Sequence, residues 1–148
     1  MPVTPLHFGP ALLVRDIVGK KNFGIWSFAA TQVAFDMEPA IRMFFDLDGT
    51  LHQTTHNPTF GVIYALLAIA LCWRWERWSA ISGAVFGSVT HLWLDSMYHS
   101  DVAEIIAKWG SYEAALYPAE TEVLCLAAFV AWGLIAGVRK SIHDRTAK

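Results

Sequence analysis

The sequence predicts an all-α fold: an integral membrane bundle of about four transmembrane helices, preceded by a short N-terminal helix that can be re-entrant. Composition is the first reason, because hydrophobic residues make up 55% of the 148 residues and charged residues only 16%. An average soluble domain is less apolar. The second reason is the recurrence of nearly uncharged stretches, at residues 23–35, 60–73, 79–94 and 123–138. A soluble all-α domain with very apolar helices is the alternative.

The elements follow in order from the N-terminus. Residues 1–10 contain three prolines and are expected to be irregular, and Pro10 suits the start of a short helix over residues 11–19. The four apolar stretches come next, and semi-polar flanks bring each toward the roughly 20 residues that cross a bilayer. Trp73, Trp75 and Trp78 close the second stretch, as expected at a membrane interface. The whole chain, residues 1–148, is expected to form one membrane-embedded domain.

The charged residues divide between the two sides of such a bundle. One side carries eight of the eleven lysines and arginines, and the other side carries ten of the thirteen carboxylates. The positive-inside rule places the basic side in the cytoplasm. We therefore expect a multi-pass protein that contacts membrane lipids and has a cytoplasmic C-terminus. The net charge of −2 gives no indication of a nucleic-acid partner.

One helix, expected over residues 79–101, combines packing with chemistry. Every fourth residue forms a row along it: Ser79, Gly83, Gly87, His91, Asp95 and His99. The small residues of the first half let another helix approach closely, so Gly83 and Gly87 are expected to contact a partner subunit or a second copy. The second half offers three side chains that bind metals or move protons.

Several side chains on the outer side of the predicted bundle are candidate ligands of a divalent metal ion. The four principal candidates are His52, His56, His91 and Asp95. The first two are spaced i, i+4, as are the last two, and this spacing puts two ligands on one helical face. Imidazole together with carboxylate favours zinc, with manganese or iron as alternatives. His7 and His99 are further candidate ligands.

Two carboxylates, Asp36 and Glu38, follow the first apolar stretch on the same outer side. A carboxylate beside a metal ion can act as a general base, or it can orient a histidine that binds the ion. We expect Asp36 and Glu38 to be the catalytic groups in this sense. Ionisable side chains at membrane depth are costly to bury, which favours a functional role over a purely structural one.

Two other chemical interpretations are weaker. Residues 43–51, MFFDLDGTL, resemble the nucleophile motif of haloacid dehalogenase-type phosphatases, with Asp46 as nucleophile and Asp48 as acid/base. That motif ends the first strand of a parallel sheet, whereas no alternation of strands and helices surrounds it here, so a polar turn between helices is expected. A bis-histidine haem is disfavoured because the histidines cluster with carboxylates near one end of the bundle.

Four short motifs occur in a set order, and together they carry a resemblance. They are PLHFGP with His7, DMEP with Asp36 and Glu38, LHQTTHN with His52 and His56, and HLWLD with His91 and Asp95. From about Pro5 to Asp101 the chain resembles the bacterial membrane-bound metal-dependent hydrolase family, which includes LexA-regulated inner-membrane proteins. The resemblance implies a location in the bacterial inner membrane, a bound metal ion and a metal-assisted hydrolysis. Glu38 departs from the family pattern, which has Asp there.

The expected function is therefore hydrolysis by a metal-activated water, acting on an ester or phosphoester of a small molecule or a lipid. Two alternatives belong to other functional classes. One is a non-enzymatic membrane protein with a structural metal site, and the other is an accessory subunit of a membrane complex. An open coordination position on the metal distinguishes the enzyme from the structural site.

Overall fold

The computed structural model describes residues 7–52, 54–108 and 118–146. Within these residues the chain forms six α-helices and no strand, which confirms the predicted all-α class. The helices are α1 (Phe8–Val18), α2 (Ile25–Phe44), α3 (Pro58–Glu76), α4 (Trp78–Tyr98), α5 (Ser100–Ala107) and α6 (Pro118–Thr146). The predicted short N-terminal helix is α1, and the four apolar stretches lie in α2, α3, α4 and α6.

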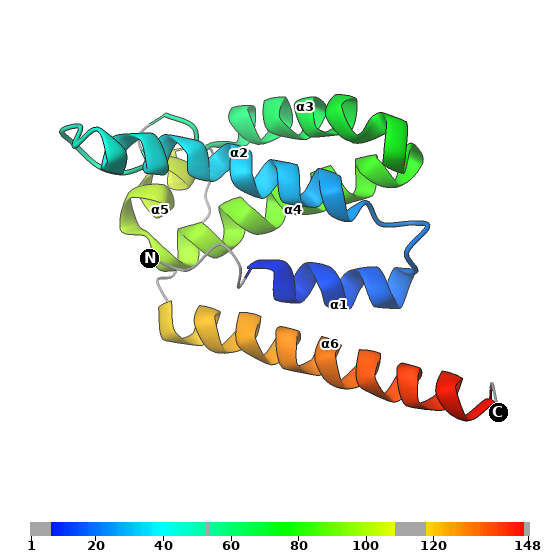
Figure 1. Ribbon diagram of the computed structural model, residues 1–148. Helices are drawn as coiled ribbons and strands as arrows, with labels where there is room; N and C mark the ends of the chain where they lie inside the picture. The colour runs from blue at the N-terminus through cyan, green and yellow to red at the C-terminus, as the bar shows by residue number, and fades with distance from the viewer. Residues whose placement is uncertain (1–6, 53, 109–117, 147–148) are drawn as a thin grey trace.

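Each long helix runs antiparallel to the long helix before it in the sequence (Figure 1). The first residues of α1, α3 and α6 lie at the same end as the last residues of α2 and α4, and α5 lies there too (Figure 1). The connections from α1 to α2 and from α3 to α4 lie at the opposite end. Side chains at the C-terminal ends of α2 and α4 can therefore meet the residues that precede α1 and α3.

Two of the helices are long and apolar enough to cross a membrane: α3, and residues Glu122–Ile142 of α6. The helices α2 and α4 do not meet the same test of length and hydropathy. Both carry ionisable side chains within their length, which include Asp36 on α2 and His91 and Asp95 on α4. Two possible spans are thus present, and the bundle of four transmembrane helices stays a prediction.

The helix expected over residues 79–101 is interrupted at its end. Tyr98 ends α4, and His99 has extended backbone angles of φ −114° and ψ 121° before α5 begins at Ser100. The His99 N–H still donates to the Asp95 carbonyl at 2.7 Å, so the chain turns away only after the last helical hydrogen bond. His99 therefore does not continue the row of His91 and Asp95, and that part of the prediction is wrong.

The helices α2 and α4 pack together through small residues. Gly83 is buried, and a Cβ added there would overlap the backbone of Gly24 at the start of α2. A Cβ on Gly87 would overlap the Thr31 hydroxyl, and the Gly24 N–H donates to the Ser79 carbonyl at 2.8 Å. The close approach predicted for this row is therefore made within the chain. The face where a partner subunit was expected is occupied by α2.

The N-terminus of α2 is capped by a side chain from another helix. Its own N-cap residue, Gly24, has no side chain to offer. Instead the Glu76 carboxylate at the end of α3 accepts the N–H groups of Trp26 and Ser27 at 2.7 and 2.9 Å. A carboxylate at this position satisfies free N–H groups and favours the positive end of the helix dipole. Glu76 thereby ties α3 to α2 at the end of the bundle opposite His56 and the start of α3.

The DLDG segment forms the predicted polar turn. Phe44 ends α2, and the turn that follows contains Asp46 at φ 50° and Gly49 at φ 100°. Asp46 and Asp48 are exposed, and in the part of the chain that the structure describes no strand precedes them. Because the phosphatase motif must end a buried strand, the resemblance of these residues to it is local only.

The contact between α2 and α4 predicts opposite effects for two glycine-to-alanine substitutions. Gly83→Ala forces a methyl group against the Gly24 backbone, and overpacking of this kind costs about 1–3 kcal/mol. Gly133→Ala, on α6, meets nothing within 4 Å and should leave stability unchanged or raise it by up to about 1 kcal/mol. Thermal unfolding in detergent measures both, and a Gly83→Ala variant as stable as Gly133→Ala would contradict the packing.

Candidate metal centre

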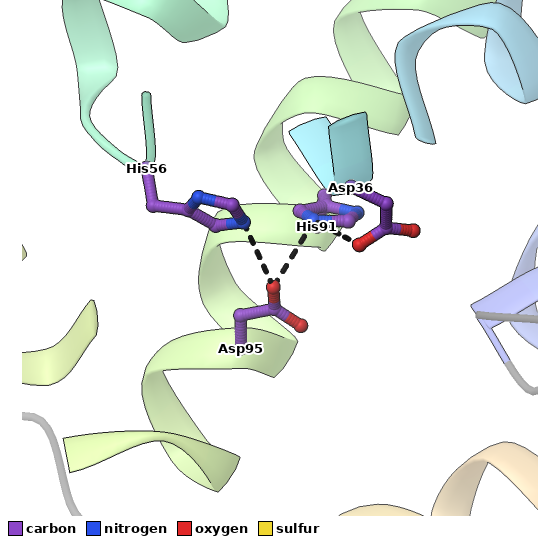
Figure 2. Close-up of side chains that lie close together, drawn as sticks. All are labelled: Asp36, His56, His91 and Asp95. Carbon is purple, nitrogen blue, oxygen red and sulfur yellow. Dashed lines mark ion pairs between the residues drawn. The ribbon is translucent and has the colours of Figure 1, made fainter. Parts of the chain in front are cut away.

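Four side chains from three segments converge inside the bundle (Figure 2). Asp36 lies on α2, His56 lies in the loop before α3, and His91 and Asp95 lie on α4. One potential ligand atom from each lies within 4.8 Å of the other three. The side chains of His56 and His91 are fully buried, whereas that of Asp36 is 34% exposed. The group is therefore open to the outside only on the side of Asp36.

Asp95 is the carboxylate that the histidines share. Its Oδ2 lies 3.0 Å from Nε2 of His91 and 3.4 Å from Nε2 of His56, as the dashed lines in Figure 2 mark. Its Oδ1 lies 3.7 Å from Nε2 of His7, the residue that precedes α1. Asp36 Oδ1 approaches the same His91 nitrogen at 3.6 Å. In each of these contacts the histidine presents the same atom, Nε2.

The amide of Gln32 determines which nitrogen of two histidines carries the proton. Its Nε2 donates to the Gly87 carbonyl at 2.9 Å, so its Oε1 must face the other way. That oxygen lies 2.8 Å from Nδ1 of His91 and 3.2 Å from Nδ1 of His7. An amide oxygen only accepts hydrogen bonds, so both Nδ1 atoms carry hydrogen. In the neutral imidazoles the Nε2 atoms are then unprotonated.

Thr55 assigns the same tautomer to His56. Its hydroxyl lies 2.6 Å from Oε2 of Glu38, and a carboxylate can only accept, so the hydroxyl hydrogen points to Glu38. The hydroxyl oxygen is then left to accept from Nδ1 of His56, 3.4 Å away. Nδ1 of His56 therefore carries the proton, and its Nε2 is unprotonated as well.

In the neutral forms of these imidazoles, three unprotonated nitrogens thus face the two carboxylates. Two of them, Nε2 of His56 and Nε2 of His91, are buried and make no hydrogen bond, although Asp95 lies beside both. Lone pairs on neutral imidazoles and carboxylate oxygens repel one another, so the group is stable only with protons or a cation between them. Unprotonated imidazole nitrogens with carboxylate oxygens are the donor set of a zinc-type ion. The residues therefore fit a metal ion.

Two histidines that lie outside the long helices, His7 and His56, favour their neutral form. Burial lowers the pKa of His7 and of His56 below the usual 6.5, and the neighbouring Asp95, which acts in the opposite direction, does not restore that value. Phe35 contributes to this burial, because its ring packs on both His91 and His56, with ring centroids 4.7 and 5.4 Å apart. Neutral imidazole is the form that binds a metal.

The predicted ligands divide into two groups instead of one. His56, His91 and Asp95 come together as predicted, and His7 adjoins them through Asp95 and Gln32. The fourth member of this group was expected to be His52. It is instead Asp36, which was predicted to be a catalytic group. His52 and His99 lie instead with Asp101 in a second group. His52 and His56 also sit in a loop, so the helical face expected for this pair is wrong.

Glu38 positions the loop that carries His56. Its carboxylate accepts the N–H groups of Thr54 and Thr55, at 3.1 and 2.7 Å, and pairs with Arg42 at 3.3 Å. These hydrogen bonds, together with one from the Thr55 hydroxyl at 2.6 Å, stabilise the ionised form of the carboxylate. A carboxylate held this firmly in its ionised form is a poor general base. Glu38 was predicted to act either as a general base or as a group that orients a histidine. These contacts fit the second role, because Glu38 holds Thr55 and Thr55 contacts His56.

Three participants were not among the predicted site residues: Gln32, Thr55 and Asp101. Gln32 had a readable signal, because a glutamine inside an apolar stretch must find hydrogen-bond partners within the protein. Thr55 precedes a candidate histidine, but nothing in the sequence pairs it with Glu38. Asp101 follows His99 closely, yet its contact with His52 depends on the interruption between α4 and α5.

Comparison with models of protein families, with curated proteins and with solved structures finds no match for this chain. We therefore infer the function from the geometry of these side chains.

The role of Gln32 predicts the effect of its removal on metal affinity. Gln32→Leu leaves two buried Nδ1–H groups without an acceptor and frees both rings to rotate, and losses of this kind weaken metal binding about 10–100-fold. Thr90→Val is the control, because the Thr90 hydroxyl bonds only to carbonyls of its own helix. Zinc titration of the two purified variants measures the difference. Equal affinity in Gln32→Leu and wild type would contradict the tautomer assignment.

Proposed function

We propose that this chain is a membrane-embedded, metal-dependent hydrolase whose ion is held by His56, His91 and Asp95, with Asp36 and His7 beside them. One observation carries the proposal: the buried Nε2 atoms of His56 and His91, whose Nδ1 atoms bond to Thr55 and Gln32, face carboxylates without a hydrogen bond. Zinc is the preferred ion, and manganese or iron would suit the same donors. When bound, such an ion supplies a Lewis acid that polarises a carbonyl or phosphoryl oxygen and activates water.

Side chains of the protein orient the metal ligands and accept the proton of the attacking water. Gln32 and Thr55 hold three imidazoles with Nε2 directed inward. Asp36 has the most exposed carboxylate of the group and lies where a substrate would enter, so its Oδ1 is the atom proposed to accept a proton from the attacking water. Glu38, which was predicted to share this task, supports His56 instead.

The surroundings support a location in the membrane. Large apolar side chains stay exposed along the bundle, as at Leu66 and Leu71 on α3 and Val89 on α4, and lipid chains would cover them. The connections that hold Lys20 and Arg77 lie at the end opposite to the N-terminus of α3 (Figure 1). In the proposal α2, α3, α4 and α6 all span, the basic end faces the cytoplasm of a bacterium, and the C-terminus is cytoplasmic.

The position of His7 fits this topology. At about 1.5 Å per residue, the 11 residues of α1 cover only about 16 Å, too little to cross a bilayer. His7 nevertheless contacts Asp95, which lies inside the bundle on α4. In the proposal α1 is re-entrant, and the metal centre lies at membrane depth and not beyond the membrane surface. A lipid-borne ester or phosphoester is the substrate class that such a depth favours.

Two matched substitutions test the function. Asp36→Asn and Asp46→Asn each replace a carboxylate by an amide, and the first alters the proposed centre while the second alters only the exposed turn after α2. For Asp36→Asn we expect hydrolysis by the zinc-loaded protein in detergent to fall at least about 100-fold on a panel of carboxylic and phosphoric esters. Asp46→Asn should retain full activity.

Other outcomes separate the alternatives. Loss of activity in Asp46→Asn alone would favour the phosphatase interpretation and contradict the metal centre. Stoichiometric zinc with no hydrolysis of any ester in the panel would favour a structural metal site. A purified protein that binds no divalent metal would contradict the proposal entirely.

A further inference from the structure

We propose that His52, His99 and Asp101 form a second cation site, distinct from the first and adjacent to it, which takes a divalent transition-metal ion such as zinc. Metal binding at this site is argued from its own geometry, and only its use in catalysis rests on the proposed function. One potential ligand atom from each of the three residues lies within 4.8 Å of the other two.

Two segments far apart in the sequence bring these residues together. His52 lies in the loop between α2 and α3, His99 lies between α4 and α5, and Asp101 lies in the first turn of α5. The His52 side chain is 5% exposed and that of Asp101 is 22% exposed, so the group is sheltered without being closed. The interruption at His99 is what permits this arrangement, because a continuous helix would not place Asp101 beside the loop.

The contacts within the group leave His52 suited to bind a metal. Asp101 Oδ2 accepts both the backbone N–H of His52, at 3.2 Å, and its Nδ1–H, at 3.1 Å. In the metal-free chain the carboxylate therefore fixes the orientation of the ring. A cation that replaced the Nδ1 proton would lie between Nδ1 of His52 and Oδ2 of Asp101, which are 3.1 Å apart, a separation that suits two ligands of one zinc-type ion.

A row of imidazoles connects this group to the first centre. The ring of His52 lies 4.5 Å from that of His99 and 4.4 Å from that of His56, measured between centroids. Neutral imidazoles so close together form a typical ligand set for transition metals. The second group therefore adjoins the first through the contact between His52 and His56.

Two neighbouring cations favour one class of substrate. Paired metal ions can stabilise both the attacking and the leaving oxygen of a phosphoryl group, and phosphoesters also present negatively charged oxygen atoms to them. With the second site occupied, the proposed hydrolase would prefer phosphoesters to carboxylic esters.

The test is the number of zinc ions bound per chain, measured by elemental analysis of detergent-purified protein after zinc loading and desalting. We expect about two ions in the wild type and about one in Asp101→Asn, in His99→Gln and in His91→Gln. Glu104→Gln, an exposed carboxylate one turn further along α5, should still bind two. Gel filtration selects the folded fraction of each variant, and the two second-site variants serve as independent checks.

Three results would overturn this inference. One ion in the wild type that is lost in His91→Gln but kept in Asp101→Asn and His99→Gln removes the second site and leaves the proposed hydrolase intact. Two ions retained in both second-site variants would likewise show that these residues hold no metal. No bound zinc in the wild type overturns the second site together with the first.

Discussion

The hydrogen bonds of Gln32 are the interaction on which the candidate site depends. A single amide on α2 donates to the backbone of α4 and accepts from His91 on α4 and from His7 before α1. It therefore holds α2, α4 and the residue before α1 at a set spacing. It also keeps a proton on Nδ1 of both His91 and His7. Because every donor and acceptor of this amide has one possible role, the geometry leaves Nε2 of both histidines free to bind a cation.

The bundle is built so that this contact can form. Glycines at 83 and 87 let α2 approach α4 closely enough for Gln32 to reach the Gly87 carbonyl. Glu76 anchors α2 at one end of the bundle, and Glu38 anchors the loop of His56 toward the other. Each carboxylate satisfies backbone N–H groups that would otherwise lack partners. The chain thus uses two of its acidic residues to position the site and others to form it.

The sequence predicts the helices and the core of the site but not its division into two groups. Apolar stretches mark α2, α3, α4 and α6, and the spacing of His91 and Asp95 places both on one face of α4, because helical periodicity is a local property. The partners of His52 and Asp36 are not local. They depend on how the loop before α3 folds back and on the extended backbone at His99, which no periodicity encodes. Membrane topology beyond the two apolar helices remains a prediction for the same reason, since charges within α2 and α4 weaken their signal.

The central claim is that unprotonated Nε2 atoms of His56 and His91, together with Asp95, hold a metal ion. Anomalous X-ray diffraction at the zinc absorption edge, from crystals of zinc-loaded protein, tests it most directly. The account predicts an anomalous peak about 2.0–2.2 Å from both nitrogens and from an Asp95 carboxylate oxygen. An absence of anomalous density at this position, with the imidazoles bonded directly to Asp95 in zinc-loaded crystals, would contradict it.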